Sequence, residues 1–348
     1  MPRKRLWHAL ESVPGLATVE AEWKALAGPD HDILRSFLRP NGSLAASYPC
    51  ARCGCAHEVI THNENDIVAV CRCEAHCPNM TLTKPEIVLH EVNRRALGKT
   101  LAGALRITAD EAPVDGLHQT DRIGFYSPFA GYRFPVVLTL QCEPEDVKMV
   151  VEQLVATADG AFILLAPSTQ LIPAAVEDLL KRKNAMFLPL ADVLDVVDGG
   201  SFKAVPRCEE LFTEFRSRSI PQADATSSAV FFPTPADAKW KDVTIRFVDG
   251  HTVSVKVKDQ TGVFHYAQMG MADGRSSKPT KQWELLRLFT ENNGLLTWGN
   301  RGANRRNQKR RENLGDDLRA FFRIDGDPFE YVEDEGGWRA RFTIMPES

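Results

Sequence analysis

The run Pro135-Val-Val-Leu-Thr-Leu140 begins the stretch of sequence that decides the fold. An amphipathic helical pattern follows over 145–157, and a second apolar run occupies 162–166. A second helical segment over 174–183 leads to a third apolar run at 186–190. Strand, helix, strand, helix, strand is typical of a parallel sheet with right-handed crossovers. We therefore predict a small parallel-sheet α/β domain.

This α/β domain lacks the glycine-rich loops that hold phosphates. The turn after the first run, 141–145, contains no glycine, and neither Leu140 nor Ala166 is followed by the acidic residue of a phosphoacceptor domain. Ser168 and Thr169, at the end of the second run, are the candidate contact for an unknown small-molecule or protein signal. We assign no catalytic residue and favour a protein that is not an enzyme.

Upstream of this domain, cysteines are concentrated in one short stretch. Six of the eight cysteines lie between positions 50 and 77, in the segments Cys50-Ala-Arg-Cys53-Gly54 and Cys71-Arg-Cys73-Glu-Ala-His-Cys77. Such spacing favours a metal site over disulfides. We predict one structural Zn²⁺ ion. Its expected ligands are Cys50, Cys53, Cys73 and Cys77, with Cys71 as the alternative to Cys73.

Two strands, 58–62 and 67–70, are predicted between these segments. Two cysteine turns on a hairpin resemble a zinc ribbon, and this resemblance implies a structural module. A surplus of thiolates favours a closed site over a catalytic one. Two alternatives stay open: free buried cysteines, and a redox sensor in which spare thiols form a disulfide and release the metal. The reserve ligands are His57, His62 and His76.

The C-terminal third combines hairpins with helices. A hairpin turns at Asp249-Gly250, a helix spans 282–293, a short strand 295–298, a helix 303–322, and a second hairpin turns at Gly336-Gly337. This order resembles the winged helix-turn-helix of response-regulator effector domains. The resemblance implies an N-terminal antiparallel sheet, three helices, a C-terminal wing and duplex DNA as partner.

The 303–322 segment is strongly basic. Between 300 and 323 there are eight basic and three acidic residues, whereas the whole chain carries a net charge of −4. At 100° per residue, Leu314, Leu318 and Phe321 share one face, provided that Gly315 does not break the helix. The wing tip, 333–335, is acidic. The candidate DNA contacts are Arg301, Asn304, Arg305, Arg306, Lys309, Arg310, Arg319, Arg339 and Arg341.

The fold class is therefore α/β plus α+β, in several domains. We expect an N-terminal helical segment (1–45), a zinc-binding module (46–85), a helix followed by the α/β domain (86–205, with the helix over 86–110), a linker (206–238) and a winged helix-turn-helix domain (239–348).

These features predict a zinc-containing transcriptional regulator that binds duplex DNA. No apolar run is long enough to span a bilayer, so we expect no membrane partner and a cytoplasmic location. We also expect a homo-oligomer, in the simplest case a dimer. One alternative is a nucleotide-processing or defence-type effector that uses the α/β domain, with the winged helix as a targeting module. Another is a protein-interaction scaffold.

Overall fold

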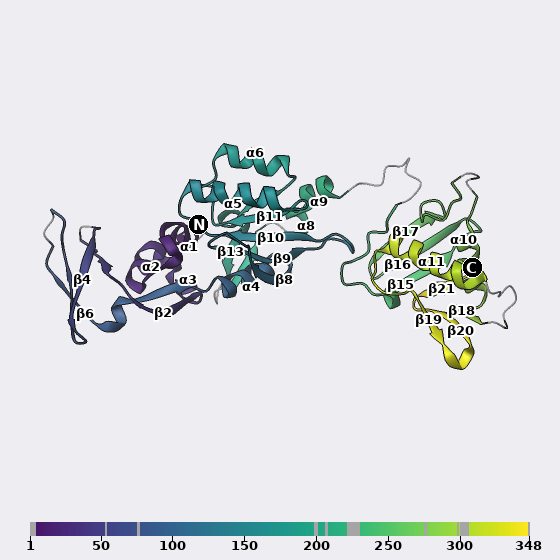
Figure 1. Ribbon diagram of the computed structural model, residues 1–348, viewed down its shortest axis with the longest axis horizontal. Helices are drawn as coiled ribbons and strands as arrows, with labels where there is room; N and C mark the ends of the chain where they lie inside the picture. Colours follow the sequence, from purple (N-terminus) through teal and green to yellow (C-terminus); the bar gives the residue numbers. More distant parts are fainter. Residues whose placement is uncertain are drawn as a thin grey trace. The chain divides into compact units, whose positions relative to one another are not determined.

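The computed structural model of the 348-residue chain describes residues 5–52, 54–74, 77–197, 201–205, 208–220, 230–274, 276, 278–297, 299 and 306–346. They form two compact units (Figure 1). Unit 1 comprises Met1–Tyr126 and Phe134–Ser219, and unit 2 comprises Ser127–Arg133 and Ile220–Ser348. The predicted mixed α/β multidomain class is confirmed. Within the described residues, no helix has both the length and the apolar character needed to cross a membrane.

The predicted parallel sheet lies in unit 1. Strands β10 (Phe134–Thr139), β11 (Ile163–Ala166) and β12 (Met186–Pro189) pair in parallel, and α5 (Pro144–Thr157) and α6 (Ala174–Arg182) connect them. All four residues of β11 are buried, as expected of a central strand covered on both faces. The predicted alternation of strands and helices is therefore confirmed.

Two further strands extend this sheet. β9 (Thr120–Tyr126) pairs antiparallel with β10, and β8 (Thr108–Pro113) pairs with β9, giving the order β12-β11-β10-β9-β8. Helix α4 (Arg94–Ala104) packs against β8 and β9, on the face opposite α5 and α6 (Figure 1). A Cβ on Gly98 would lie 2.8 Å from the Ile123 side chain, so glycine permits this close approach.

The helix predicted over 86–110 is wrong at both ends, since α4 stops at Ala104 and Thr108–Pro113 form β8. Residues Val88–Val92 form β7, which lies between β1 (Ala17–Val19) and β2 (Leu38–Leu44). Pairing with two neighbouring strands overrides the helical spacing of the apolar residues. Helix α4 begins only after Asn93, whose side-chain oxygen accepts a hydrogen bond from the Ala96 N–H.

The cysteine-rich segment folds as a small antiparallel sheet in the order β3-β4-β5-β6. The predicted hairpin is confirmed as β4 (Ala56–Asn63) and β5 (Asp66–Val70). The short strands β3 (Ser47–Pro49) and β6 (Met80–Leu82) flank it. Its apolar cluster crosses the predicted boundaries at 45/46 and 85/86, since its buried members are Val19, Ala45, Ile67, Ala69, Leu82 and Ile87.

Short elements complete unit 1. Part of the predicted linker is helical, because Phe212 stacks on Tyr126 at 4.2 Å and Phe215 packs edge-on to Phe134 at 5.0 Å. Residues 206–207 and 221–229 of that linker lie outside the described residues. The remaining elements are α1 (Arg5–Ser12), α2 (Glu20–Ala27), α3 (His31–Arg35), α7 (Leu190–Val193), β13 (Leu194–Val197), β14 (Ser201–Ala204), α8 (Cys208–Leu211) and α9 (Thr213–Ser219), with 3-10 turns at Pro14–Leu16, Gly28–Asp30 and Lys84–Ile87.

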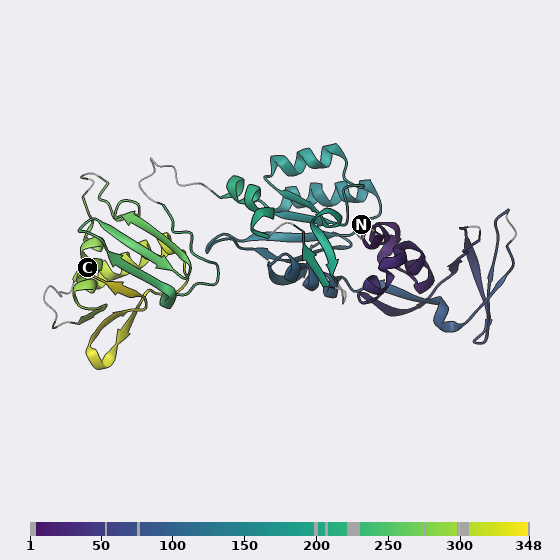
Figure 2. The same ribbon diagram turned by 180° about the vertical axis from the view of Figure 1, so that it is seen from behind.

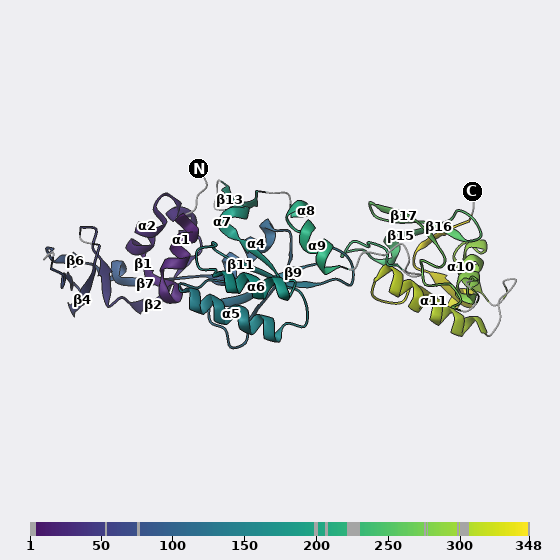
Figure 3. The ribbon, with the colours of Figure 1, turned by 90° about the horizontal axis from the view of Figure 1, so that it is seen from above.

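Unit 2 is built on a four-stranded sheet. β15 (Val243–Phe247) and β16 (Thr252–Val257) form the predicted hairpin, and β17 (Gln260–His265) pairs with β16. The three-residue strand β21 (Thr343–Met345) lies parallel to β15. In the reverse view the sheet of unit 2 faces the reader (Figure 2), and from above α11 runs along one side of it (Figure 3).

The helices and the second hairpin of unit 2 follow the predicted order. They are α10 (Lys281–Glu291), β18 (Leu295–Thr297), α11 (Arg306–Phe322), β19 (Phe329–Val332) and β20 (Gly337–Ala340). The last two strands form a sheet with β18, in the order β18-β20-β19. The described part of unit 2 holds two α-helices, whereas the winged-helix resemblance implies three.

Helix α11 is continuous across Gly315. Leu314, Leu318 and Phe321 are at most 2% exposed, so the predicted apolar face is confirmed. They belong to one core with Trp283 and Phe289 of α10 and with the inward side chains of β15 and β16. Two 3-10 turns, Trp240–Asp242 and Glu333–Glu335, precede β15 and join β19 to β20.

Candidate metal centre

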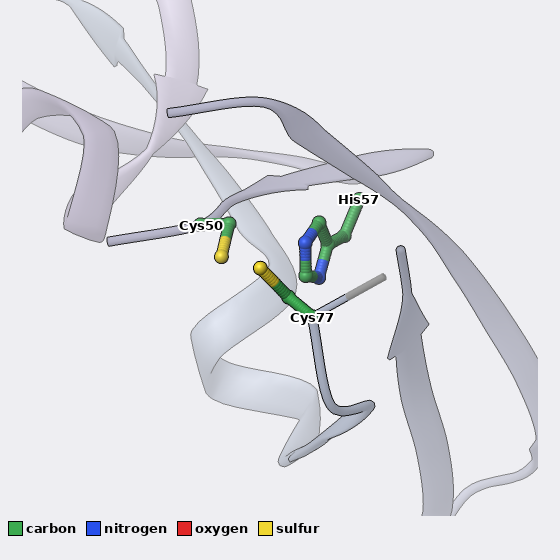
Figure 4. Close-up of side chains that lie close together, drawn as sticks. All are labelled: Cys50, His57 and Cys77. Atoms are coloured by element: carbon green, nitrogen blue, oxygen red, sulfur yellow. The ribbon is translucent and has the colours of Figure 1, made fainter. Parts of the chain in front are cut away.

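Three potential metal ligands meet at one end of the β3-β6 sheet. The Sγ atoms of Cys50 and Cys77 and a ring nitrogen of His57 all lie within 4.8 Å of one another (Figure 4). Cys50 is 6% exposed and His57 is fully buried. In a tetrahedral zinc site, ligand atoms lie roughly 3.3–3.8 Å apart, given zinc bond lengths of about 2.0–2.3 Å. Two thiolates and an imidazole are a donor set that zinc accepts, and the three ligand atoms lie close enough together to face one ion.

A tight turn positions Cys50. The Gly54 N–H donates to the Cys50 carbonyl and the Cys50 N–H donates to the Cys55 carbonyl, both at 3.0 Å. Gly54 has a φ of +68°, a conformation that favours glycine. Gly54 therefore closes a tight turn beside Cys50.

Strand register positions His57. On β4 it lies opposite Tyr48 of β3, and it directs its ring to the buried side. Cys77 reaches the cluster from the segment that precedes β6, so the three ligands come from three separate stretches of chain. The sequence places His57 only among the reserve ligands, because β3 is too short to recognise from a three-residue pattern.

The structure brings together only some of the predicted metal ligands. Cys50 and Cys77 are brought together, whereas Cys53 lies outside the described residues. Cys71 and Cys73 do not belong to the group of three. Their Sγ atoms lie 3.2 Å from each other, and both side chains are partly exposed.

Arg72, between these two cysteines, is held against the hairpin. Its Nε donates to the Glu58 carboxylate of β4 at 2.9 Å. This ion pair is exposed and therefore weak. Cys53, Cys71 and Cys73 remain the predicted candidates for a fourth ligand, since none of them belongs to the described group of three.

The candidate DNA contacts lie in unit 2. Arg301, Asn304 and Arg305 fall outside the described residues, as does the side chain of Arg306, and Arg310 is partly exposed on α11. Each of the other four has a carboxylate partner. The pairs are Lys309–Glu312 at 3.1 Å, Arg319–Asp316 at 2.5 Å, Arg339–Glu335 at 2.6 Å and Arg341–Glu330 at 3.4 Å.

Arg311 has a different position from its basic neighbours. It is 8% exposed, its guanidinium carbon lies 3.9 Å from the Trp338 ring centroid, and Nη1 donates to Asp327 at 2.6 Å. This residue therefore ties α11 to the β19-β20 hairpin and is not available to a ligand.

The predicted signal contact of the α/β domain is occupied from within unit 1. The Ser168 N–H and hydroxyl donate to the Glu11 carboxylate of α1, at 2.9 and 2.8 Å. Burial raises the pKa of Glu11 above its usual value, although the Ser168 hydrogen bonds act in the opposite direction. This contact fastens α1 to the end of β11.

No family model, no curated protein and no solved structure matches this chain.

Proposed function

We propose that the protein is a zinc-containing DNA-binding protein, in which one Zn²⁺ ion stabilises the β3-β6 sheet. The observation that carries the metal assignment is the convergence of Cys50, His57 and Cys77. A structural role is supported by the size of the sheet, whose apolar cluster has few buried residues. Binding a structural zinc ion contributes roughly 10–16 kcal/mol to comparable small modules.

The first test is metal content. Full-length protein purified without added metal should contain one zinc per chain, measured by mass spectrometry of the metal. Cys50→Ser and Cys77→Ser should lose most of it, because each removes a thiolate of the cluster. Cys142→Ser is the matched control, since Cys142 lies between β10 and α5 and outside the cluster.

Two further variants identify the fourth ligand. If Cys73→Ser lowers zinc affinity and Cys71→Ser does not, Cys73 completes the site. If both variants keep full zinc content, loss of zinc in Cys53→Ser would assign the position to Cys53. A purified wild-type chain that carries no zinc and takes up none would exclude the proposal.

The proposed DNA-binding surface lies in unit 2. Its support is the element order, together with α11, which buries an apolar face and carries basic residues on the other side. Such a helix can enter the major groove. As a regulator, the protein would use unit 1 to sense a signal or to form a homo-oligomer.

Salt-dependent binding to random duplex DNA tests this surface. Arg305→Glu, Lys309→Glu and Arg310→Glu together should weaken binding at low salt and flatten its dependence on salt concentration. Lys256→Glu, Lys278→Glu and Lys281→Glu together, at exposed positions of unit 2, are the charge-matched control. The absence of any wild-type binding at low salt would exclude DNA as the partner.

One observation favours an effector that acts on a small molecule. A polar cleft of about 890 Å³ in unit 1 is lined by the ion pairs Arg39–Glu91, Arg94–Asp121 and Arg95–Glu111. Turnover of nucleotides by the full chain, abolished in Arg94→Gln, would favour this function. The acidic tip Glu333–Glu335 of the second hairpin instead suits a protein-binding scaffold, because it would repel phosphates.

A further inference from the structure

A second cleft, in unit 2, has a different electrostatic character. Its volume is about 730 Å³, within the range of small-ligand sites. Four stretches of chain line it: Ala130–Gly131, residues 236 and 238–241, residues 323–325, and the pair Glu330 and Arg341. The first stretch belongs to the 127–133 segment, which is part of unit 2 despite its place in the sequence.

Cations outnumber acids around this cleft. Lys239, Lys241, Arg323 and Arg341 face it, against the two acids Asp325 and Glu330. Of the four, Arg341 pairs with Glu330 at 3.4 Å. In the part of the chain that the structure describes, no carboxylate lies within ion-pairing distance of the other three. The C-terminal end of α11 adds only about half a negative charge, so the cleft remains positive.

The excess of unpaired cations distinguishes the cleft from the outer face of α11. There, Lys309 and Arg319 each have an acid three residues away. A phosphate would have to displace those carboxylates, whereas Lys239 and Lys241 are exposed and can bind an anion directly. Unpaired cations also give the stronger local field for attracting a polyanion.

Arg323 is already held in place. Its guanidinium carbon lies 4.3 Å from the ring centroid of Tyr132 and 4.4 Å from that of Phe231. Gly131 has a φ of +78°, and a Cβ there would lie 2.7 Å from Cδ of Arg323. Stacking between two rings reduces the side-chain entropy that ligand binding would otherwise cost.

The 127–133 segment is itself anchored. The Ala130 N–H donates to the Thr234 carbonyl at 2.8 Å, and Tyr132 packs against Phe231 with ring centroids 5.4 Å apart. Arg323 also has a positive φ of 55° at the end of α11, which for a non-glycine residue requires support from its surroundings. The cleft is therefore a preformed site.

We propose that this cleft binds a phosphate group, and that the group is part of a nucleic-acid backbone. Guanidinium and ammonium groups are the side chains that bind phosphate most readily. Arg341 connects the cleft with the β19-β20 hairpin, because it follows β20 directly and pairs with Glu330 of β19. The choice of nucleic acid rests on the proposed function, whereas the phosphate site rests on the cleft alone.

The test uses the full zinc-loaded chain and a fluorescent 20-base-pair duplex, with binding followed by anisotropy across a salt series. Lys239→Gln with Lys241→Gln should weaken binding about tenfold or more at low salt and reduce the salt slope by about two. Lys256→Gln with Lys278→Gln is the control, since both lysines are exposed in unit 2 and neither lines the cleft. Equal losses in the two variants would overturn the proposal.

Two further measurements distinguish a failure of the cleft assignment from a failure of the proposed DNA binding. If only Lys309→Glu with Arg310→Glu weakens duplex binding, DNA binding stands and the cleft assignment fails. If the wild type binds no duplex but binds inorganic pyrophosphate in calorimetry, and the Lys239→Gln and Lys241→Gln variant does not, the phosphate site stands and nucleic acid is the wrong source. Binding of neither probe overturns both assignments. Unchanged melting temperatures confirm that the variants fold.

Discussion

Two four-stranded sheets of this protein differ in what stabilises them. In the β3-β6 sheet, the buried positions of β4 and β5 are essentially His57, Ile67 and Ala69, and the rest of the hairpin is partly or fully exposed. In unit 2, the three inward residues of β15 and the three of β16 are at most 4% exposed, and α10 and α11 belong to the same core. The sheet of unit 2 therefore has a packed apolar core of its own, whereas the β3-β6 sheet has few buried apolar residues and would depend on the proposed zinc ion.

The largest expected effect is metal removal. A strong zinc chelator, or His57→Ala with Cys50→Ser, should unfold the β3-β6 sheet, because its apolar cluster is too small to replace a bond network worth roughly 10 kcal/mol. Hydrogen exchange read by mass spectrometry should show loss of protection in peptides from 47–82. Peptides from 243–257 are the internal control and should not change. Retained protection over 47–82 without metal would contradict the difference between the sheets.

The reverse perturbation targets the apolar core of unit 2. Leu318→Ala should lower its free energy of unfolding by about 3 kcal/mol, because it opens a cavity beside fully buried neighbours. Urea denaturation measures the loss, and zinc content should stay at one ion per chain. Val263→Ala is the control, since Val263 is 63% exposed on β17. A change below about 1 kcal/mol in Leu318→Ala would show that this core is loosely packed.

A smaller effect is expected at Arg311. Arg311→Ala should cost about 2 kcal/mol, less than for a fully buried pair because the Asp327 side chain is 41% exposed. Arg319→Ala, which removes an exposed pair within one helix turn, should cost at most about 0.5 kcal/mol. Equal costs in urea denaturation would mean that burial over Trp338 contributes nothing.

The smallest effect is a pH dependence of unit 2. Burial, and then the neighbouring Asp316, raise the pKa of Asp317 from 3.8 to about 6. The folded state thus binds this proton more tightly, so the free energy of unfolding should fall as pH rises from about 4 through about 6. Asp317→Asn should remove about 1 kcal/mol of this fall, a value reduced for partial exposure.

Urea denaturation at pH 4 and pH 8 measures this difference. The control is Asp334→Asn, at an exposed position of the β19-β20 turn, and it should leave the pH dependence as in the wild type. An identical stability difference between Asp317→Asn and wild type at the two pH values would rule out the raised pKa.

Features with local causes could be predicted from the sequence. The parallel strands β10 to β12 follow from short apolar runs, and the β15-β16 hairpin follows from alternation around Asp249 and Gly250. The buried face of α11 follows from helical spacing, and the tight turn at Gly54 follows from the need for a positive φ.

Features that depend on pairing between residues far apart in the sequence could not be predicted from it. The strands β3, β6 and β21 are three residues long and exist only through their partners. The strand β7 has helical apolar spacing, but two neighbouring strands determine its conformation. The 127–133 segment belongs to unit 2 through Arg323 and Thr234, which are about a hundred or more residues away.

The same distinction explains the candidate metal site. Cysteine spacing alone selects Cys50 and Cys77, and the structure brings these two together. His57 enters the cluster because β3 and β4 pair in one register, opposite Tyr48. No pattern within the cysteine segments contains this register, so the histidine could be named only as a reserve.

The most direct test of the proposed zinc site is X-ray absorption spectroscopy at the zinc edge on the full chain. We predict a sulfur shell at about 2.3 Å together with the outer-shell scattering of one imidazole, which should disappear in His57→Ala. A shell of four sulfurs without imidazole scattering in the wild type would contradict the assignment of Cys50, His57 and Cys77 as the core of the site.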